Sequence, residues 1–538
     1  MVHPSSTIPA PTRKRAGGKR SKTGCRTCRA RHVKCDETPA QCRNCTSSGR
    51  VCGGYDSPRL PRATRGTVSP QVTDGFGWAM TSDEQRCFSY FQHHTIPTLL
   101  EMFESPLWRK LVLAMSYSEP AVYHAAVALS AAHEDAEGCG FALPGQARQD
   151  TWRQFAIDQS LRSFAILNRR RSSRDPKLRE VMLICCLLYV FLELLSGCHE
   201  NACRHLRSGL QILKEARAHR QLIGASESPV ESCLVAAFAE LDIQSPFFGS
   251  PGPVLCLNDE VDQYSWLESF PFGFRGIFDA QQAFAPFMYS SYRFVARCWP
   301  LTEEHRMANY DALQSEQRQL LSHMIRFADL CEPLSASYSQ LSRKEQRGVD
   351  IIHAQQRHVV LEVSTCLLSR FSPTRDCFTP HYQAHLCELK SIIRKSPECP
   401  SLSPFPSLLP CLYAIVYSCR DYEVCLEATE ELHRWTHCEG MFNSAWLALA
   451  AIEHMRLDFL EEEMSHRSSP LDTFATGMNE ERSHIWSRIE DLRWRITGGR
   501  PDYLDEVLQA SAYMKTWICV RVLQMRKARL NESFCMPP

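Results

Sequence analysis

Six cysteines near the N-terminus have types and spacing suited to metal binding. They follow the pattern C-x2-C-x6-C, and after six further residues the same pattern occurs again. In a C-x2-C pair, the two thiolates of one short turn can reach adjacent corners of a zinc tetrahedron, at Zn–S distances of about 2.3 Å. The spacing therefore predicts a zinc module built from an internal repeat, whose ligands are Cys25, Cys28, Cys35, Cys42, Cys45 and Cys52.

The number of cysteines limits how many zinc ions the module can hold. Two closed tetrahedral sites need eight ligand positions, which six thiolates fill only if two sulfurs bridge both metals. The repeat predicts two zinc ions per chain and equivalent bridges, most simply Cys25 and Cys42. So short a segment has almost no hydrophobic core, whereas structural zinc supplies roughly 10 kcal/mol or more, so we expect folding only with metal.

Two other interpretations use some of the same cysteines. One is a single-zinc ribbon with Cys25, Cys28, Cys42 and Cys45 as its ligands, and the other is a zinc buffer without affinity for DNA. Neither explains why the x6 spacing is repeated, or why basic residues surround it.

Charge is divided unevenly along the chain of 538 residues, although the net charge is only +1. Residues 1–65 hold 15 Lys and Arg and 3 Asp and Glu; out of totals of 61 and 60, the remaining residues hold 46 and 57. Two zinc dications on six thiolates would add about −2, so the first 65 residues stay near about +10. A strongly basic head on an acidic body predicts a polyanionic partner for the head alone.

The residues around the third cysteine carry a family resemblance. Together with the six cysteines, they resemble the fungal Zn2Cys6 binuclear-cluster family of transcription factors. The resemblance implies that Cys25 and Cys42 bridge the metals, and that a short helix after Cys28 enters the major groove of double-stranded DNA, typically at a CGG triplet. The matching residues beside the cysteines are Arg29, Arg31, His32, Lys34, Asp36 and Pro39.

The basic residues of the module can be divided between bases and phosphates. Arg and Lys suit the O6 and N7 acceptors of guanine, while contacts to phosphate fix the orientation of the protein. His32 stands where the family most often has Lys; a neutral imidazole donates one hydrogen bond, so base reading could be weaker and vary with pH. We assign base reading to Arg31 and His32, and phosphate contacts to Arg26, Arg29, Lys34 and Arg43.

The segments on either side of the module, which spans 25–52, have the composition of flexible chain. Residues 1–24 are rich in Pro, Ser, Thr and basic residues and show no apolar periodicity, which predicts a disordered arm. Residues 53–81 predict a linker, and prolines break it where many family members carry a dimerising heptad segment. A homodimer would then form through the helical body, and a monomer is equally open. The basic cluster in the arm, which suits nuclear import, phosphate contact or a solvated tail, is Arg13, Lys14, Arg15, Lys19, Arg20 and Lys22.

Residues 82–538 predict one large, mainly α-helical body, because apolar residues recur at three and four residues and strand-like alternation is rare. Ser118 is placed to cap the first clear helix, and Pro120 stands in its first turn. Loops rich in Pro and Ser interrupt the pattern near 371–380, 396–410 and 465–470. The periodic positions that predict buried helix faces are Val122, Ala125, Ala126, Leu129 and Ala132, then Ile157, Leu161, Phe164 and Leu167, then Leu206, Leu210, Leu213 and Ala216.

The remaining cysteines and apolar runs favour core packing. The stretch from Val181 to Leu195 is too short to cross a bilayer and contains Glu193, so we expect a buried helix and no membrane partner. Without a secretory signal at the N-terminus, we expect reduced cysteines. Cys198, His199, Cys203 and His205 lie close together and could form a second metal site, but free cysteine is commonly a small buried hydrophobe, so we interpret them as core as well. The chain contains no H-E-x-x-H, no G-x-S-x-G and no complete phosphate-binding loop, which argues against an enzyme.

Stretches of the body also resemble the helical middle-homology regions that follow the zinc cluster in this family. They lie at 103–134, 203–213, 241–249 and 439–453. The resemblance implies a nuclear transcription factor for RNA polymerase II genes, controlling a metabolic or secondary-metabolite pathway, whose body receives signals or contacts co-regulators or the transcription machinery. A second hypothesis is a nucleic-acid-binding accessory or scaffold protein without sequence preference.

Overall fold

The computed structural model describes residues 24–38, 41–55, 60, 78, 80–141, 150–173, 175, 177–224, 228–245, 255, 273–298, 301–368, 372–395, 400–466, 480–500 and 503. Pro39, most of the expected linker at 53–81 and the basic cluster Arg13, Lys14, Arg15, Lys19, Arg20 and Lys22 lie outside these residues.

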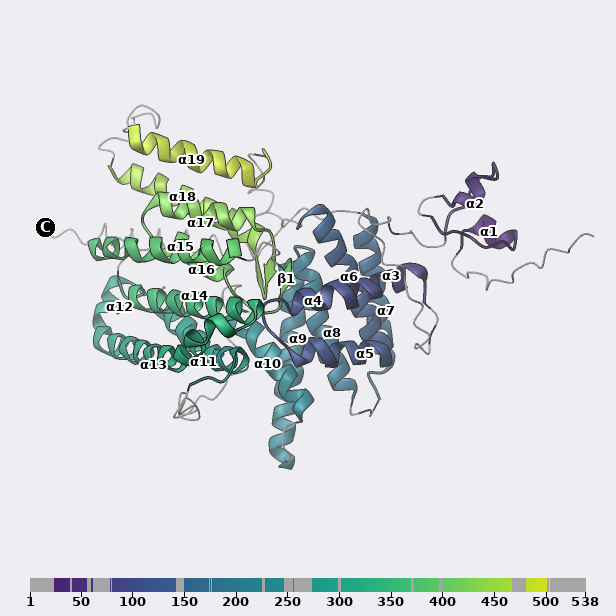
Figure 1. Ribbon diagram of the computed structural model, residues 1–538, viewed down its shortest axis with the longest axis horizontal. Helices are drawn as coiled ribbons and strands as arrows, with labels where there is room; N and C mark the ends of the chain where they lie inside the picture. The colour runs from purple at the N-terminus through teal and green to yellow at the C-terminus, as the bar shows by residue number, and fades with distance from the viewer. Residues whose placement is uncertain are drawn as a thin grey trace, which may run out of the picture.

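The N-terminal unit is small and has a core of its own. It contains two short helices, α1 (Arg26–Ala30) and α2 (Arg43–Thr46) (Figure 1). The core of this unit consists of five of the six cysteines, with Cys52 and Tyr55 packed against them. The buried apolar side chains of the body form a second, separate cluster.

The first part of the body is a group of helices around two that are almost fully buried (Figure 1). α6 and α8 pack against each other, α7 covers α6, and α9 covers α8. The elements of this group are α3 (Ser82–Tyr90), a π-helical turn η1 (Phe91–Thr95), α4 (Ile96–Leu99), a second π-helical turn η2 (Leu107–Val112), α5 (Leu113–Ser118), α6 (Pro120–Cys139), α7 (Thr151–Arg169), α8 (Leu178–Leu195), α9 (His199–Ile223) and α10 (Pro229–Gln244).

The second part of the body is another stack of helices, drawn in green and yellow in Figure 1, with three two-residue strands near the first group. The strands form one sheet in the order β1-β2-β3, in which β1 and β2 are parallel and β2 and β3 antiparallel. Its elements are α11 (Ile277–Cys298), α12 (Glu303–Ala308), α13 (Tyr310–Ala336), η5 (Tyr338–Gln340), α14 (Arg343–Thr365), η6 (Pro373–Phe378), α15 (Thr379–Lys395), β1 (Leu402–Ser403), α16 (Leu409–Ser418), α17 (Tyr422–Arg434), β2 (Cys438–Glu439), β3 (Phe442–Asn443), α18 (Ser444–His466) and α19 (Glu480–Ile496).

The mainly helical body is confirmed, and so is the buried helix expected at Val181–Leu195, which lies within α8. Among the described residues, none of the helices combines the length and the apolar character that crossing a membrane requires. The helices are interrupted near the three predicted loops, although those segments also hold η6, the start of α15, β1, the start of α16 and the end of α18.

The predicted cap of α6 is wrong. Ser118 is the last residue of α5, and its hydroxyl donates to the carbonyls of Ala114 and Met115 in that helix. The N-cap of α6 is instead Glu119, with φ −118° and ψ 109°. A residue before proline is pushed to this extended conformation, so Pro120 separates the two helices.

The predicted buried face of α7 is also wrong. Ile157, Leu161 and Phe164 are 43%, 60% and 40% exposed. The face turned toward α6 carries Gln159 and Ser163, because their polar groups have buried partners. Ser163 Oγ donates to the carbonyl of Ala121 at 2.6 Å, and Gln159 Nε2 donates to Glu84 Oε1 at 3.0 Å.

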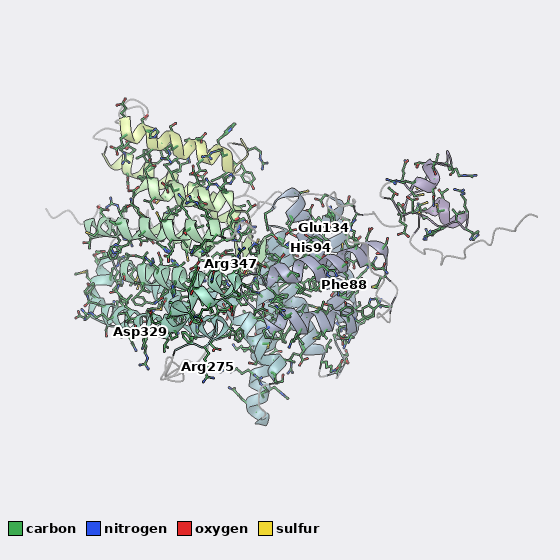
Figure 2. The ribbon with its side chains drawn as sticks, viewed as in Figure 1. Phe88, His94, Glu134, Arg275, Asp329 and Arg347 are labelled. Atoms are coloured by element: carbon green, nitrogen blue, oxygen red, sulfur yellow. The ribbon has the colours of Figure 1, made fainter. Side chains whose placement is uncertain are left out.

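Contacts between distant segments join the two parts of the body. Gln244, at the end of α10, accepts a hydrogen bond from the backbone N–H of Met441 at 2.8 Å, between β2 and β3. This bond links two of the stretches with family resemblance, 241–249 and 439–453. Arg347 of α14, labelled in Figure 2, pairs with Glu101 at 2.9 Å. The two helical groups therefore share buried and charged contacts.

Candidate zinc cluster and nucleic-acid interface

Cys25 and Cys42 each begin a helix of the N-terminal unit. Each is the N-cap, and its sulfur accepts a hydrogen bond of 3.3 Å from the backbone N–H three residues later, at Cys28 and Cys45. A cap of this kind satisfies one of the N–H groups that a helix start leaves without a partner. The C-x2-C spacing thus places both sulfurs of a pair on the same side of a short turn.

The sulfurs of the two halves lie close together. Cys25 and Cys42 are 3.6 Å apart, as are Cys28 and Cys42, and Cys28 and Cys45 are 3.8 Å apart. A zinc tetrahedron with bonds of about 2.3 Å has edges of roughly 3.8 Å. The sulfurs of the two halves are therefore spaced like ligands that belong to the same metal ion.

The six cysteines form two overlapping groups of four. One is Cys25, Cys28, Cys35 and Cys42, the other is Cys25, Cys42, Cys45 and Cys52, and within each group all sulfurs lie within 4.8 Å of one another. Cys25 and Cys42 belong to both. This arrangement fits a binuclear site in which these two sulfurs bridge the metals.

The internal repeat extends to the backbone. With an offset of 17 residues, His32 corresponds to Gly49 and Glu37 to Gly54, and all four have positive φ, of 55°, 64°, 55° and 69°. The backbone N–H of Cys25 donates to the sulfur of Cys35, and that of Cys42 to Cys52, both at 3.4 Å. The two halves therefore have the same local fold, but only the first half keeps side chains at the left-handed positions, where glycine is favoured.

Asp36 holds the two halves together. Its carboxylate accepts hydrogen bonds of 3.0 Å from the backbone N–H groups of Arg43 and Asn44, at the start of α2. Burial alone would raise the pKa of Asp36, but the hydrogen bonds from Thr38, Asn44 and Arg43 outweigh it and keep the pKa well below its usual range. Asp36 is thus an ionised cap for the second helix.

Burial and backbone donors act in opposite senses on the cluster thiols. Burial raises the pKa of Cys25 to about 12 and also raises that of Cys28, whereas backbone N–H groups outweigh burial at Cys35 and Cys52 and lower their pKa. A coordinating cation overrides the effect of burial, because it binds the thiolate and displaces the proton. The donors present, soft sulfurs in a small closed group, suit zinc.

Most of the basic residues assigned to DNA lie at the surface of this unit. Arg26 and Arg29 are exposed on α1, His32 and Lys34 are exposed in the segment after it, and Arg43 is exposed on α2, whereas Arg31 is half-buried. Sequence reasoning left out Arg50, a further exposed cation, and the capping role of Asp36. The basic character of the second repeat could have indicated Arg50.

Of the four residues at the start of α9, His199 is buried, whereas Cys198, Cys203 and His205 are half-buried. The ring of His199 lies 4.7 Å from that of Trp446, and the ring of His205 lies 5.1 Å from that of Tyr189. The structure instead brings together a group that sequence reasoning missed, namely His358, His385 and Cys411. No local spacing could have indicated it, since its members come from three different helices.

Comparison with known proteins finds two family profiles in the chain. The Fungal Zn(2)-Cys(6) binuclear cluster domain matches residues 23–62, and the Fungal specific transcription factor domain matches residues 86–412. No solved structure matches the chain.

Curated relatives carry regulatory names. The chain is 30% identical over 290 residues to the aspercryptin biosynthesis cluster-specific transcription regulator atnN of Emericella nidulans, which is 46% of each chain. It is 25% identical over 210 residues to the transcription regulator lscL of Purpureocillium lilacinum, covering 37% of this chain and 50% of that one. It is 47% identical over 62 residues to the transcriptional regulatory protein moc3 of Schizosaccharomyces pombe, covering 12% and 11%.

The chain spans about half the length of the first two of these relatives. The second profile alone covers more than half of this chain, and the cysteine groups occur where the first profile matches. The chain therefore belongs to the fungal Zn(2)-Cys(6) transcription factors.

Proposed function

We propose that this chain is a sequence-specific transcription factor that binds double-stranded DNA at CGG-type sites through residues 25–52. The observation that carries the proposal is the pair of overlapping four-sulfur groups that share Cys25 and Cys42, surrounded by exposed basic side chains. When bound, zinc supplies the cross-link that a unit without an apolar core lacks. We further propose two zinc ions per chain, held by Cys25, Cys28, Cys35, Cys42, Cys45 and Cys52.

The basic side chains divide between base edges and phosphates. Arg31 and His32 follow α1 directly, so a helix lying in the major groove presents them to base edges. Arg26, Arg29, Lys34 and Arg43 contact phosphates and set the orientation of the unit, and their charge makes binding depend on salt. The basic cluster of the arm, from Arg13 to Lys22, suits nuclear import or further phosphate contact.

The body provides regulation in this proposal. The chain acts in the nucleus on RNA polymerase II genes of a metabolic or secondary-metabolite pathway, as the names of the first relative and of the arginine metabolism regulation protein II of Saccharomyces cerevisiae suggest. The body contacts co-regulators or the transcription machinery, and a homodimer would form through it.

The test is selection from a random duplex DNA pool by the full chain loaded with zinc. Beside the wild type run Cys42→Ala, which removes a bridging position, and Cys331→Ser, which changes a buried cysteine of α13 far along the chain. We expect the wild type and Cys331→Ser to enrich sites with CGG triplets and Cys42→Ala to enrich none. The number and spacing of the triplets then report monomer or dimer.

A different result would favour the second hypothesis. If the wild type binds zinc and DNA but enriches no sequence, and random duplex competes as well as any selected site, then the chain is a nucleic-acid-binding accessory protein. Salt dependence alone does not separate the two, since both use phosphate contacts.

A further inference from the structure

Three potential metal ligands meet in the interior of the body, far from the N-terminal cysteines. His358 lies on α14, His385 on α15 and Cys411 on α16, and they are 4%, 1% and 1% exposed. A ligand atom from each lies within 4.8 Å of the other two. Three neighbouring helices thus direct two imidazoles and one thiol to the same buried point.

The surroundings of His385 indicate that one of its nitrogens is available for a ligand. Its Nδ1 lies 3.5 Å from Glu388 Oε2, and the same carboxylate oxygen is paired with Arg357 Nε at 2.9 Å. Its Nε2 is buried and has no hydrogen-bond partner among the residues that the structure describes. A carboxylate behind one imidazole nitrogen, with the other nitrogen free, is how metal-binding histidines are usually oriented.

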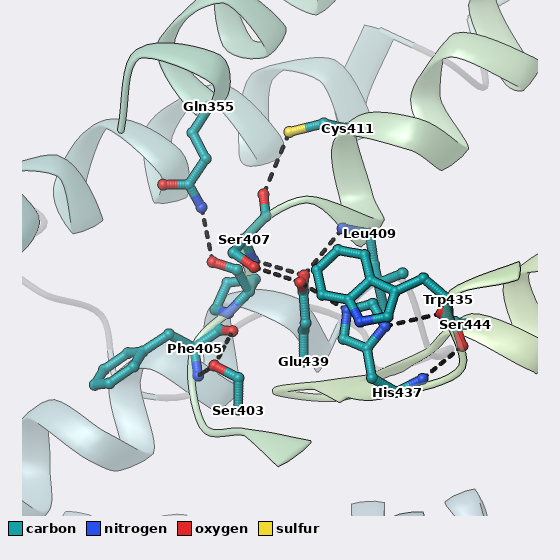
Figure 3. Close-up of polar contacts among 11 residues, drawn as sticks. Gln355, Ser403, Phe405, Ser407, Leu409, Cys411, Trp435, His437, Glu439 and Ser444 are labelled. Carbon is teal, nitrogen blue, oxygen red and sulfur yellow. Dashed lines mark hydrogen bonds and ion pairs between the residues drawn. The ribbon is translucent and has the colours of Figure 1, made fainter. Parts of the chain in front are cut away.

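The electrostatic environment favours a cation at this point. Burial, and then Glu439, Glu388 and Glu362, raise the pKa of the Cys411 thiol well above its usual range. Burial and the neighbouring His385 lower the pKa of His358 to about 3, so its imidazole is neutral and has a lone pair to offer. The thiol of Cys411 donates a hydrogen bond of 3.4 Å to the carbonyl of Ser407 (Figure 3).

We propose that His358, His385 and Cys411 bind one thiophilic metal ion, Zn²⁺ or Cu⁺, in the regulatory body. Two imidazoles and a thiolate are the donors that both ions prefer. The thiolate neutralises one charge, the nearby carboxylates offset the rest, and the proton of Cys411 leaves when the ion binds. The bound ion would cross-link α14, α15 and α16, which otherwise contact one another through packing and hydrogen bonds.

The experiment reads this metal separately from the N-terminal cluster. The parent is the full chain with Cys25→Ala and Cys42→Ala, and it is compared with the same chain carrying Cys411→Ser, His385→Gln or Cys331→Ser. Cys331 is the matched control, since it is 2% exposed and lies on α13 outside the group. Each chain is loaded with Zn²⁺ or, without oxygen, with Cu⁺, and the metal kept after dialysis is counted by mass spectrometry.

We expect the parent and Cys331→Ser to keep one metal ion more than Cys411→Ser and His385→Gln, because any metal left at the N-terminus cancels in the difference. The ion that gives this difference identifies the metal. Loading with Co²⁺ should give a thiolate-to-cobalt absorption band that Cys331→Ser keeps at full strength and Cys411→Ser weakens, since the remaining N-terminal cysteines contribute equally to all the variants. No difference with either ion, together with equal cobalt bands in Cys331→Ser and Cys411→Ser chains that keep the circular dichroism of the parent, would overturn the proposal. Because the parent lacks the DNA-binding cluster, this outcome is independent of the proposed function.

Discussion

At the scale of single residues, the 17-residue repeat singles out His32. Its counterpart Gly49 has the same left-handed backbone with no side chain, so the first half keeps an imidazole where the fold would favour glycine. For a residue with a Cβ this conformation costs about 1–2 kcal/mol. An unfavourable residue at an exposed position beside α1 points to a role outside folding.

The variant His32→Gly separates the cost of the strained backbone from the contribution of the imidazole to DNA binding. We expect the variant to bind zinc at least as firmly, because the strain is relieved. We expect its affinity for the selected site to fall about 5-fold to 10-fold, which is the loss of about one hydrogen bond to a base edge. Fluorescence anisotropy with selected and random duplexes measures this. Gly49→Ala is the control, since it adds strain in open space at the matching position and should leave DNA affinity unchanged. Equal affinity of His32→Gly and wild type would remove His32 from base reading.

Glu439 is a second residue with a defined task, in the sheet next to α16. It is fully buried and accepts from the backbone N–H groups of Ser407 and Leu409, at 2.8 and 2.9 Å (Figure 3). His437 Nε2 lies 2.9 Å from its other oxygen, and Nδ1 lies 3.0 Å from the carbonyl of Trp435. Both ring nitrogens of His437 thus lie against oxygen atoms, and the carboxylate of Glu439 has polar partners at both of its oxygens.

Glu439 should make the free energy of unfolding depend on pH. Burial alone would raise its pKa, but His437 and Ser407 outweigh burial and lower it. A lowered folded-state pKa stabilises the protein above the unfolded value of about 4.3 and ceases to do so as pH falls through the folded value. Glu439→Gln should cost about 3–5 kcal/mol at pH 7 and less in acid. Urea unfolding at pH 7 and in acid measures this. As a control, Glu345→Gln, at an exposed capping residue, should change the free energy of unfolding little. Equal losses of stability for Glu439→Gln at both pH values would contradict the role assigned to Glu439.

At the scale of elements, the helices were predictable and their faces only in part. The apolar spacing of α6 and α9 predicted buried faces correctly, as the buried Val122 and Leu210 show, and the continuous apolar run of α8 predicted a buried helix. On α7 the same spacing misled, since Gln159 and Ser163 satisfy buried polar partners of α6 and α3 and so take the inner face. The spacing of apolar residues indicates which face of a helix is apolar, but it does not indicate which polar side chains will have buried hydrogen-bond partners.

The close packing of α9 against α10 requires a glycine at position 209. A Cβ on Gly209 of α9 would lie 2.1 Å from the ring of Phe238, a fully buried residue of α10. Gly209→Ala should therefore destabilise the body by about 1–3 kcal/mol, although alanine is the better helix former. Gly138→Ala, in α6 with open space around it, is the control and should be neutral or stabilising. Thermal unfolding followed by circular dichroism compares them, and a Gly209→Ala chain as stable as Gly138→Ala would show that the helices can move apart.

At the scale of the whole molecule, the basic head and the acidic body have separate buried cores. The cysteine grouping of the head could be predicted from sequence, because it is contained in one short repeat, whereas the capping role of Asp36 could not. The His358, His385 and Cys411 group could not, because only the packing of α14, α15 and α16 brings its members together.

Chelation should separate the two parts. The helices of the head hold five and four residues, so its unfolding removes little of the helical signal. We expect a strong chelator to abolish binding to the selected DNA site while circular dichroism of the body stays nearly unchanged, because the head has no apolar core without zinc, whereas the apolar core of the body holds its helices together with or without a bound ion. Restored zinc should restore binding. Collapse of the helical signal together with DNA binding would mean that head and body fold as one unit.

Because the two cores share no buried residue, the amount of chain in a cell would not depend on whether its head can bind DNA. In a cell short of zinc, the head would open while the body stayed folded and resisted the proteases that remove unfolded chains. Such a chain would still bind the partners of its body but would not recruit them to DNA. Zinc starvation would thus turn the regulator into a competitor of its own zinc-loaded copies, and silence its target genes more sharply than the loss of metal alone.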